Sequence, residues 1–205
     1  MTPVIDTLKQ GRILWTIAAA TLSGWISAAA LTPVMDQLER LGLGDLSGLL
    51  VSFSSTAGIA FGLFGGALLH IFAKQRPHVS VAFLVTSMAG IAAAVYVAMV
   101  SFSNADPSFI LPYGLGSPVG ALSVAVPLAF IGRYRTPWTC IGLATLLPTM
   151  WAIGVAAFFD HDAALELAGL SALYIGWQGL FLAVFVLSPK AAKAEPTSGG
   201  SAELP

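Results

Sequence analysis

The stretch Leu46–Ala73, "LSGLLVSFSSTAGIAFGLFGGALLHIFA", contains no lysine, arginine, aspartate or glutamate, and the basic sequence "KQRPH" follows it directly. About 20 apolar residues in a helix cross the roughly 30 Å hydrocarbon core of a bilayer. The stretch exceeds this length, so it predicts a transmembrane helix that tilts or extends beyond the core.

The composition of the whole chain is likewise apolar and poor in charged residues. Of its 205 residues, 57% are hydrophobic and only 9% are charged, whereas soluble domains carry roughly 25% charged residues. Segments of about ten residues with alternating polarity, which mark membrane β-barrels, are absent from the sequence. We therefore expect an all-α, polytopic integral membrane bundle.

Clusters of charged residues divide this bundle into six predicted transmembrane helices. The predicted spans are residues 13–34, 46–73, 79–102, 109–131, 138–159 and 167–187. Residues 1–12 form a predicted cytoplasmic N-terminus, and residues 13–188 form the transmembrane domain. The remaining residues, 189–205, are small, polar and rich in Pro, Gly and Ser, which predicts a disordered cytoplasmic tail.

Lysine and arginine predict the orientation. If the N-terminus is cytoplasmic, Arg40 is the only basic residue that falls outside, and positive charge in short loops resists translocation. Both termini are therefore predicted to be cytoplasmic, in a plasma membrane that we expect to be a bacterial inner membrane. A cleaved N-terminal signal ending near "SAAALTP" (27–33) is the alternative and would leave five spans. The apolar run there exceeds a usual signal core and continues past this site, which disfavours cleavage.

Small residues at helical spacing indicate how the helices pack. Lipid is as apolar as leucine, so membrane helices associate by close backbone approach over small side chains. The second span carries such a ridge in Ser54, Gly58, Gly62 and Gly66. Shorter rows follow the same spacing in the first, third and sixth spans. A tight bundle is the favoured interpretation, with a homo-oligomer contact through the second span as the alternative.

Reactive groups are scarce within the predicted spans. No lysine, arginine, aspartate or glutamate lies in the central part of any span, which disfavours a carboxylate-based proton pump. His70 lies one turn from Lys74 and is interpreted as interfacial. The acidic sequence "DHDAALE" (160–166) could ligate a cation, but a solvated external loop is favoured, so no metal site is predicted.

Other function classes are disfavoured by what the sequence lacks. The net charge of −1 argues against a nucleic-acid partner. Cys140 is the one cysteine and is interpreted as a small apolar filler. The sequence has no nucleophile–base pair, phosphate loop or paired-histidine motif, so we expect a protein that is not an enzyme and has no cofactor.

Polar and aromatic residues near the middle of four spans predict a solute pathway. The fourth span contains "LPYGLGSPVG" (111–120), where proline and glycine predict a locally unwound helix. Gln178 offers a donor pair and an acceptor, so we expect it to satisfy the freed backbone of residues 116–120 in a pocket walled by Tyr174 and Trp177. The predicted pathway residues are Ser23, Trp25, Gly116, Ser117, Pro118, Trp151, Tyr174, Trp177 and Gln178.

Two functions fit these observations. One is a small carrier or channel for a neutral or weakly polar small solute, favoured by the polar groups at mid-depth. The alternative is a non-transporting membrane subunit or sensor that packs against partner membrane proteins, favoured by the glycine ridges and the absence of charge. The expected surroundings are the lipid bilayer, with a homo-oligomer or a partner membrane subunit as further possibilities.

Overall fold

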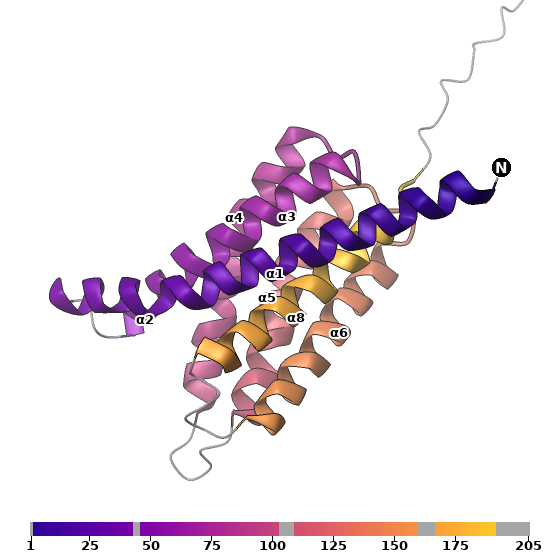
Figure 1. Ribbon diagram of the computed structural model, residues 1–205. Coiled ribbons are helices and arrows are strands. Elements are labelled where there is room, and N and C mark those ends of the chain that lie inside the picture. The colour runs from indigo at the N-terminus through magenta and orange to yellow at the C-terminus, as the bar shows by residue number, and fades with distance from the viewer. Residues whose placement is uncertain (1, 43–45, 103–108, 160–166, 192–205) are drawn as a thin grey trace, which may run out of the picture.

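The computed structural model describes residues 2–42, 46–102, 109–159 and 167–191 (Figure 1). Six helices in these ranges are long and apolar enough to cross a membrane, and the same ranges contain no strand. The predicted all-α, six-span membrane bundle is therefore confirmed. The acidic sequence 160–166 and tail residues 192–205 lie outside the described ranges.

Five of the six spans are single α-helices, and the second is composite. The single helices are α1 (Thr2–Arg40), α4 (Pro77–Ser101), α5 (Ile110–Ile131), α6 (Pro137–Phe158) and α8 (Leu167–Leu187). The second span consists of α2 (Leu46–Phe53), the π-helix η1 (Ser54–Gly58) and α3 (Ile59–Ile71).

Local sequence explains where several helices begin and end. Pro77 and Pro137 occupy the first position of α4 and α6, where a missing N–H costs no helical hydrogen bond. The first helix is longer than the predicted span 13–34 because it passes through Pro33 and ends only at Arg40. Gly42 follows with a φ of +76°, a left-handed conformation that commonly terminates helices.

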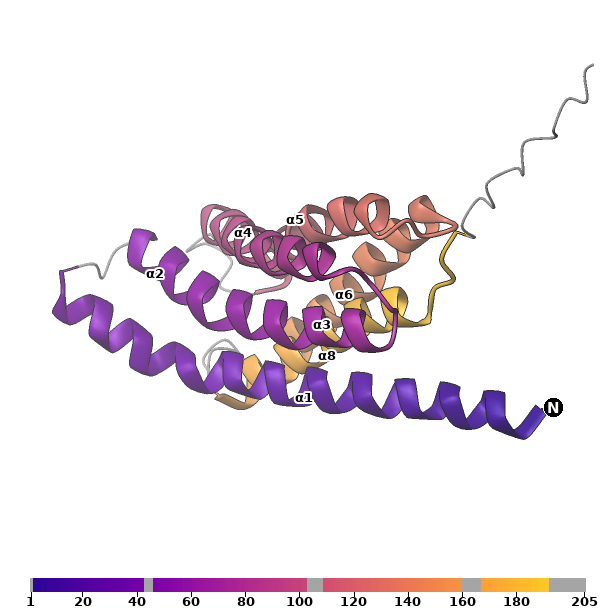
Figure 2. The same ribbon diagram turned by 90° about the horizontal axis from the view of Figure 1, so that it is seen from above.

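The helices form a closed ring in which each packs against its neighbours in sequence. The second span lies between α1 and α4, α5 lies between α4 and α6, and α8 closes the ring by packing against both α6 and α1. Figure 2 shows α1 along one face of the bundle and α4 and α5 along the opposite face.

Basic residues gather at one end of this ring. The side chain of Gln75, between α3 and α4, donates to the Gly132 carbonyl after α5 at 3.1 Å. The backbone N–H of Arg135 donates to the Pro189 carbonyl at 3.0 Å, so the end of α8 lies there too. We call this the basic end; Lys74, Arg76, Arg133 and Lys190 flank these contacts. The opposite end carries Arg40 and the start of α8. Placing the basic end in the cytoplasm remains a prediction from charge.

The predicted ridge on the second span faces α4. A Cβ added at Gly62 would lie 2.8 Å from the Leu84 Cα, and one at Gly58 would lie 2.7 Å from the Met88 Cα. Ser80 donates its hydroxyl to the Gly66 carbonyl at 2.9 Å, and the fourth ridge residue, Ser54, donates to the Leu50 carbonyl within the same span. Gly58, Gly62 and Gly66 therefore pack against α4 within the chain.

Candidate functional site

The fourth span is not unwound as predicted. Helix α5 continues from Ile110 to Ile131 through Pro118. The glycines serve another purpose, because a Cβ at Gly116 would lie 2.6 Å from the Ala94 carbonyl oxygen and one at Gly120 would lie 3.1 Å from the Gly90 carbonyl oxygen. They bring the backbones of α5 and α4 together, as small residues do in membrane helices.

A pocket of about 550 Å³ lies between the middle of the bundle and its opposite end. Helices α1, α2, α4, α5 and α8 contribute most of its wall. Near the opposite end it is lined by Met35, Phe53, Met99, Phe102 and Phe109, and at its deepest point by Gly116, Ser117, Gly120, Ala152 and Trp177. We call this the large pocket. It reaches the mid-depth region that the sequence singled out.

Few polar groups line the large pocket, and none of its lining residues is acidic or basic. Tyr113 and Tyr174 contribute phenol groups, and Ser117 contributes a hydroxyl. Trp177 donates its indole N–H to the Ser117 oxygen at 2.8 Å, and that oxygen lies 3.2 Å from the Thr149 hydroxyl on α6. The lining thus suits an uncharged, largely apolar molecule with one or two hydrogen-bonding groups.

Aromatic side chains fill the bundle beyond the deepest part of the pocket. Trp177 stacks on Phe181 with ring centroids 5.7 Å apart, and Phe61 lies edge-on to both. Phe185 continues this aromatic column to Tyr134 at the basic end. Tyr134 is 4% exposed, and burial raises the pKa of its phenol to about 12. On α8 the lining of the large pocket stops at Trp177, where the column begins.

Gln178 is fully buried, but it faces α1 rather than α5. Ser23 donates its hydroxyl to the Gln178 side-chain oxygen, and the amide of Gln178 donates to the Ser27 hydroxyl at 3.3 Å. Ser27 in turn donates to the Ser23 carbonyl at 2.7 Å. The predicted contact between Gln178 and the backbone of 116–120 is therefore wrong, and Gln178 does not line the large pocket. Its role is to join α1 and α8 through a buried polar cluster.

The other predicted pathway residues are dispersed. Trp25 is 53% exposed on the outer surface of α1. Trp151 donates its indole N–H to the Ala172 carbonyl at 2.8 Å and lies against Gly176, outside the large pocket. Pro118 is half-buried and does not line the large pocket either. Of the predicted pathway residues, Gly116, Ser117, Tyr174 and Trp177 line the large pocket. The other five do not line it: Ser23, Trp25, Pro118, Trp151 and Gln178.

The sequence reasoning missed most of the apolar wall of the pocket. Tyr113 is the clearest omission, because it lies one helical turn before Ser117 and so on the same face of α5. Phe109, four residues before Tyr113, and Gly120, three residues after Ser117, lie on the same face, so this face could have been recognised from the sequence. Phe53, which also lines the pocket, lies immediately before η1. A π-helix is often found at functional sites, but no pattern in the sequence indicates one here.

Neither of the remaining candidate reactive residues forms a site. His70 lies near the basic end with its Nδ1 2.9 Å from the Gln75 carbonyl oxygen, and Cys140 is buried in the apolar core. Among the residues that the structure describes, no group of three His, Cys, Asp or Glu side chains could hold a metal ion.

Comparisons with protein-family models, with curated proteins and with solved structures found no match. A function for the chain therefore has to be inferred from the large pocket itself.

Proposed function

We propose that this membrane protein is a carrier that takes a small, uncharged and largely apolar solute into the large pocket. The observation that supports this best is the pocket itself, whose volume of about 550 Å³ falls within the usual range of roughly 300–1,000 Å³ for small-molecule sites. Such sites combine an apolar wall with a few polar groups that orient the ligand, and Tyr113, Tyr174 and Ser117 provide such groups here.

The lining argues for an uncharged solute. An ionised group buried in an apolar environment requires a counter-charge or several hydrogen bonds. No lining residue of the large pocket carries a formal charge, so a carboxylate or ammonium group would lose its hydration without compensation. A hydroxyl or carbonyl group, in contrast, can pair with the tyrosine hydroxyls.

The aromatic column favours a carrier over an open channel. A channel needs a path across the whole membrane, whereas here the rings of Trp177, Phe181 and Phe61 pack together beyond the pocket, and Phe181 and Phe61 are fully buried. A solute in the large pocket therefore lies nearer the end of the bundle opposite the basic end. Its release at the basic end would require the column to rearrange, as in alternating access.

Thermal unfolding of the purified protein with matched pairs of solutes tests this proposal. The pair 1-adamantanol and 1-adamantanecarboxylate shares one apolar skeleton and differs in charge. We expect the alcohol to raise the melting temperature and the carboxylate to have no effect, because only the alcohol enters the pocket without losing a charged group's hydration. Equal shifts for both solutes, or none for either, would contradict the proposal.

A pair of variants on α4 tests whether the alcohol raises the melting temperature by binding in the large pocket. Val95 lines the large pocket, so Val95→Phe should fill it and remove the shift caused by the alcohol. Val85 lies on the same helix but is 59% exposed on the outer surface, so Val85→Phe is the matched control and should retain the shift. If both variants retain it, the alcohol binds elsewhere.

A second candidate, a membrane subunit that packs against a partner, is supported by α6. Gly142, Leu146, Met150 and Gly154 repeat every four residues and are exposed. A Cβ added at either glycine would meet nothing within 4 Å, so neither glycine is needed for packing inside the chain. If this face binds a partner, Gly142→Leu should release a protein that co-purifies in mild detergent and leave the melting temperature of the isolated chain unchanged.

A further inference from the structure

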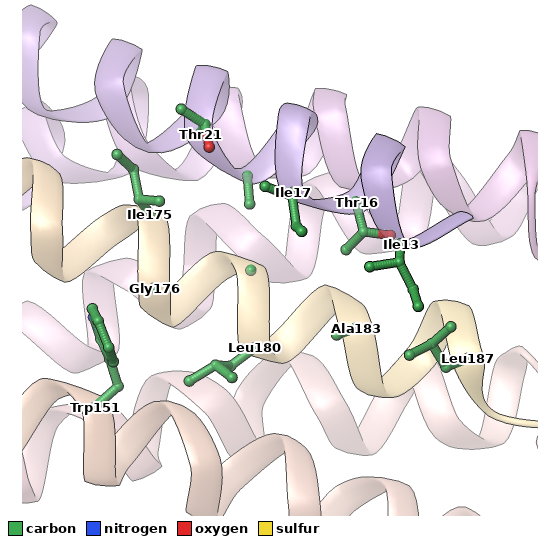
Figure 3. A pocket seen from close by; sticks show the side chains of 12 residues that line it. Ile13, Thr16, Ile17, Thr21, Trp151, Ile175, Gly176, Leu180, Ala183 and Leu187 are labelled. Carbon is green, nitrogen blue, oxygen red and sulfur yellow. The ribbon is translucent and has the colours of Figure 1, made fainter. Parts of the chain in front are cut away.

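A second hollow lies on the outside of the bundle, along α1 and α8. It has a volume of about 310 Å³ and is lined almost entirely by apolar side chains. Figure 3 shows Ile13 and Leu187 at one end, Thr21 and Ile175 toward the other, and Trp151 rising from α6 toward Gly176 on α8 near that second end. We call this hollow the α1–α8 groove.

The groove is open along the outer surface of the bundle. Ile13, Ile17 and Leu187 are 44%, 57% and 51% exposed, respectively, and they lie on helices that are apolar enough to cross a membrane. Of the polar side chains along the groove, Thr16 and Trp151 have partners inside the protein, and Thr21 lies toward the end away from Ile13 and Leu187. Thr16 donates its hydroxyl to the Arg12 carbonyl at 2.8 Å, and Trp151 donates to Ala172. An occupant therefore gains contact with apolar surface and needs no hydrogen-bonding group within the groove.

The length of the groove matches one leaflet of a bilayer. At about 1.5 Å per helical residue, the wall from Ile13 to Thr21 measures roughly 12 Å and the wall from Ile175 to Leu187 roughly 18 Å. Half of the roughly 30 Å hydrocarbon core is about 15 Å. One extended acyl chain thus fits along the groove, with its methyl end at Trp151 and its headgroup end beside Ile13 and Leu187.

Basic residues flank the headgroup end. Arg12 directly precedes Ile13, and Lys190 follows three residues after Leu187 at the basic end. We propose that the α1–α8 groove binds an anionic phospholipid, with one acyl chain along the groove and the phosphate held by Arg12 and Lys190. This site is separate from the large pocket and does not depend on the proposed transport function.

Native mass spectrometry of the delipidated protein tests the proposal, with phosphatidylglycerol and phosphatidylcholine of identical acyl chains as probes. We expect phosphatidylglycerol to bind about tenfold more tightly, because each basic side chain near an anionic lipid adds attraction. The double variant Arg12→Gln/Lys190→Gln should lose this preference. Arg76→Gln removes a charge at the same end but away from the groove, and should keep it.

The acyl-chain part of the site is tested by filling the groove. Ala183→Phe should weaken the binding of both lipids, whereas Ala157→Phe, the same change at an exposed position of α6 outside the groove, should weaken neither. Leu180→Trp fills the groove at a second point if Ala183→Phe does not fold. Equal affinity for the two lipids, equal loss in the Arg76 variant, or undiminished binding in a folded groove-filling variant would each overturn the proposal.

Discussion

Trp177 on α8 donates its indole N–H to the hydroxyl of Ser117 on α5 at 2.8 Å, and both side chains are at least nine-tenths buried. This hydrogen bond joins two helices at the deepest point of the large pocket. Because Trp177 also stacks on Phe181, the position of one indole ring determines both where the pocket ends and where the aromatic column begins.

Ser117→Ala should destabilise the protein by about 1–3 kcal/mol, because it leaves the buried Trp177 N–H without its acceptor. Denaturation in mixed detergent micelles measures this loss. Ser123→Ala is the control, since Ser123 lies on the same helix and donates only to the Val119 carbonyl of its own helix. If the two variants are equally stable, the Trp177–Ser117 hydrogen bond does not stabilise the bundle.

Gln178→Leu should cost about 1–3 kcal/mol by leaving the hydroxyls of Ser23 and Ser27 without a partner across the helix interface. Binding in the large pocket should persist, because Gln178 does not line it. Combining this variant with Ser23→Ala in a double-mutant cycle measures how strongly α1 and α8 are coupled. Purely additive losses would show that the buried polar cluster does not act as a unit.

Gly62→Leu should disrupt the fold far more than Leu63→Ala. At position 62 even a Cβ would lie 2.8 Å from the Leu84 Cα, so α3 and α4 would have to separate. Leu63 is 56% exposed, and its truncation leaves no cavity inside the bundle. Melting temperatures of the two purified variants measure the difference, and equal values would argue against close packing at this ridge.

The sidedness predicted from charge is tested with impermeant thiol reagents on intact cells, in a Cys140→Ala background. A cysteine at Asn104, in a predicted external loop, should react. A cysteine at Thr136, between α5 and α6 at the basic end, should not react until the cells are permeabilised. The reverse pattern would place the basic end outside and would require the solute to enter the large pocket from the cytoplasm.

The spans could be predicted from the sequence because length and apolarity depend on local composition alone. Helix ends were harder to predict: α1 runs past the predicted limit of 34 to Arg40, because charged residues such as Asp36 and Glu39 end an apolar run without ending a helix, and the left-handed Gly42 follows. The π-helix η1 was not predictable, because nothing in "SSTAG" (54–58) distinguishes it from a regular turn of α-helix.

The site was only partly predictable, because helices that are apolar on all sides do not reveal which face points inward. Trp25 and Trp177 look equivalent in sequence, yet one is 53% exposed and the other 8%. The glycines at 116 and 120 could mean either a broken helix or a close approach. Only the position of Ala94 on the neighbouring helix shows that they permit close approach.

Photolabelling tests the central claim, binding of an uncharged apolar solute in the large pocket, most directly. An uncharged adamantane diazirine would be photolysed with the purified protein, and the modified residues would be mapped by mass spectrometry. We predict labels on pocket residues such as Tyr113 and Tyr174, suppressed by 1-adamantanol and by Val95→Phe but not by 1-adamantanecarboxylate or Val85→Phe. Labels confined to the outer surface of the helices, unchanged by the alcohol and by Val95→Phe, would contradict the account.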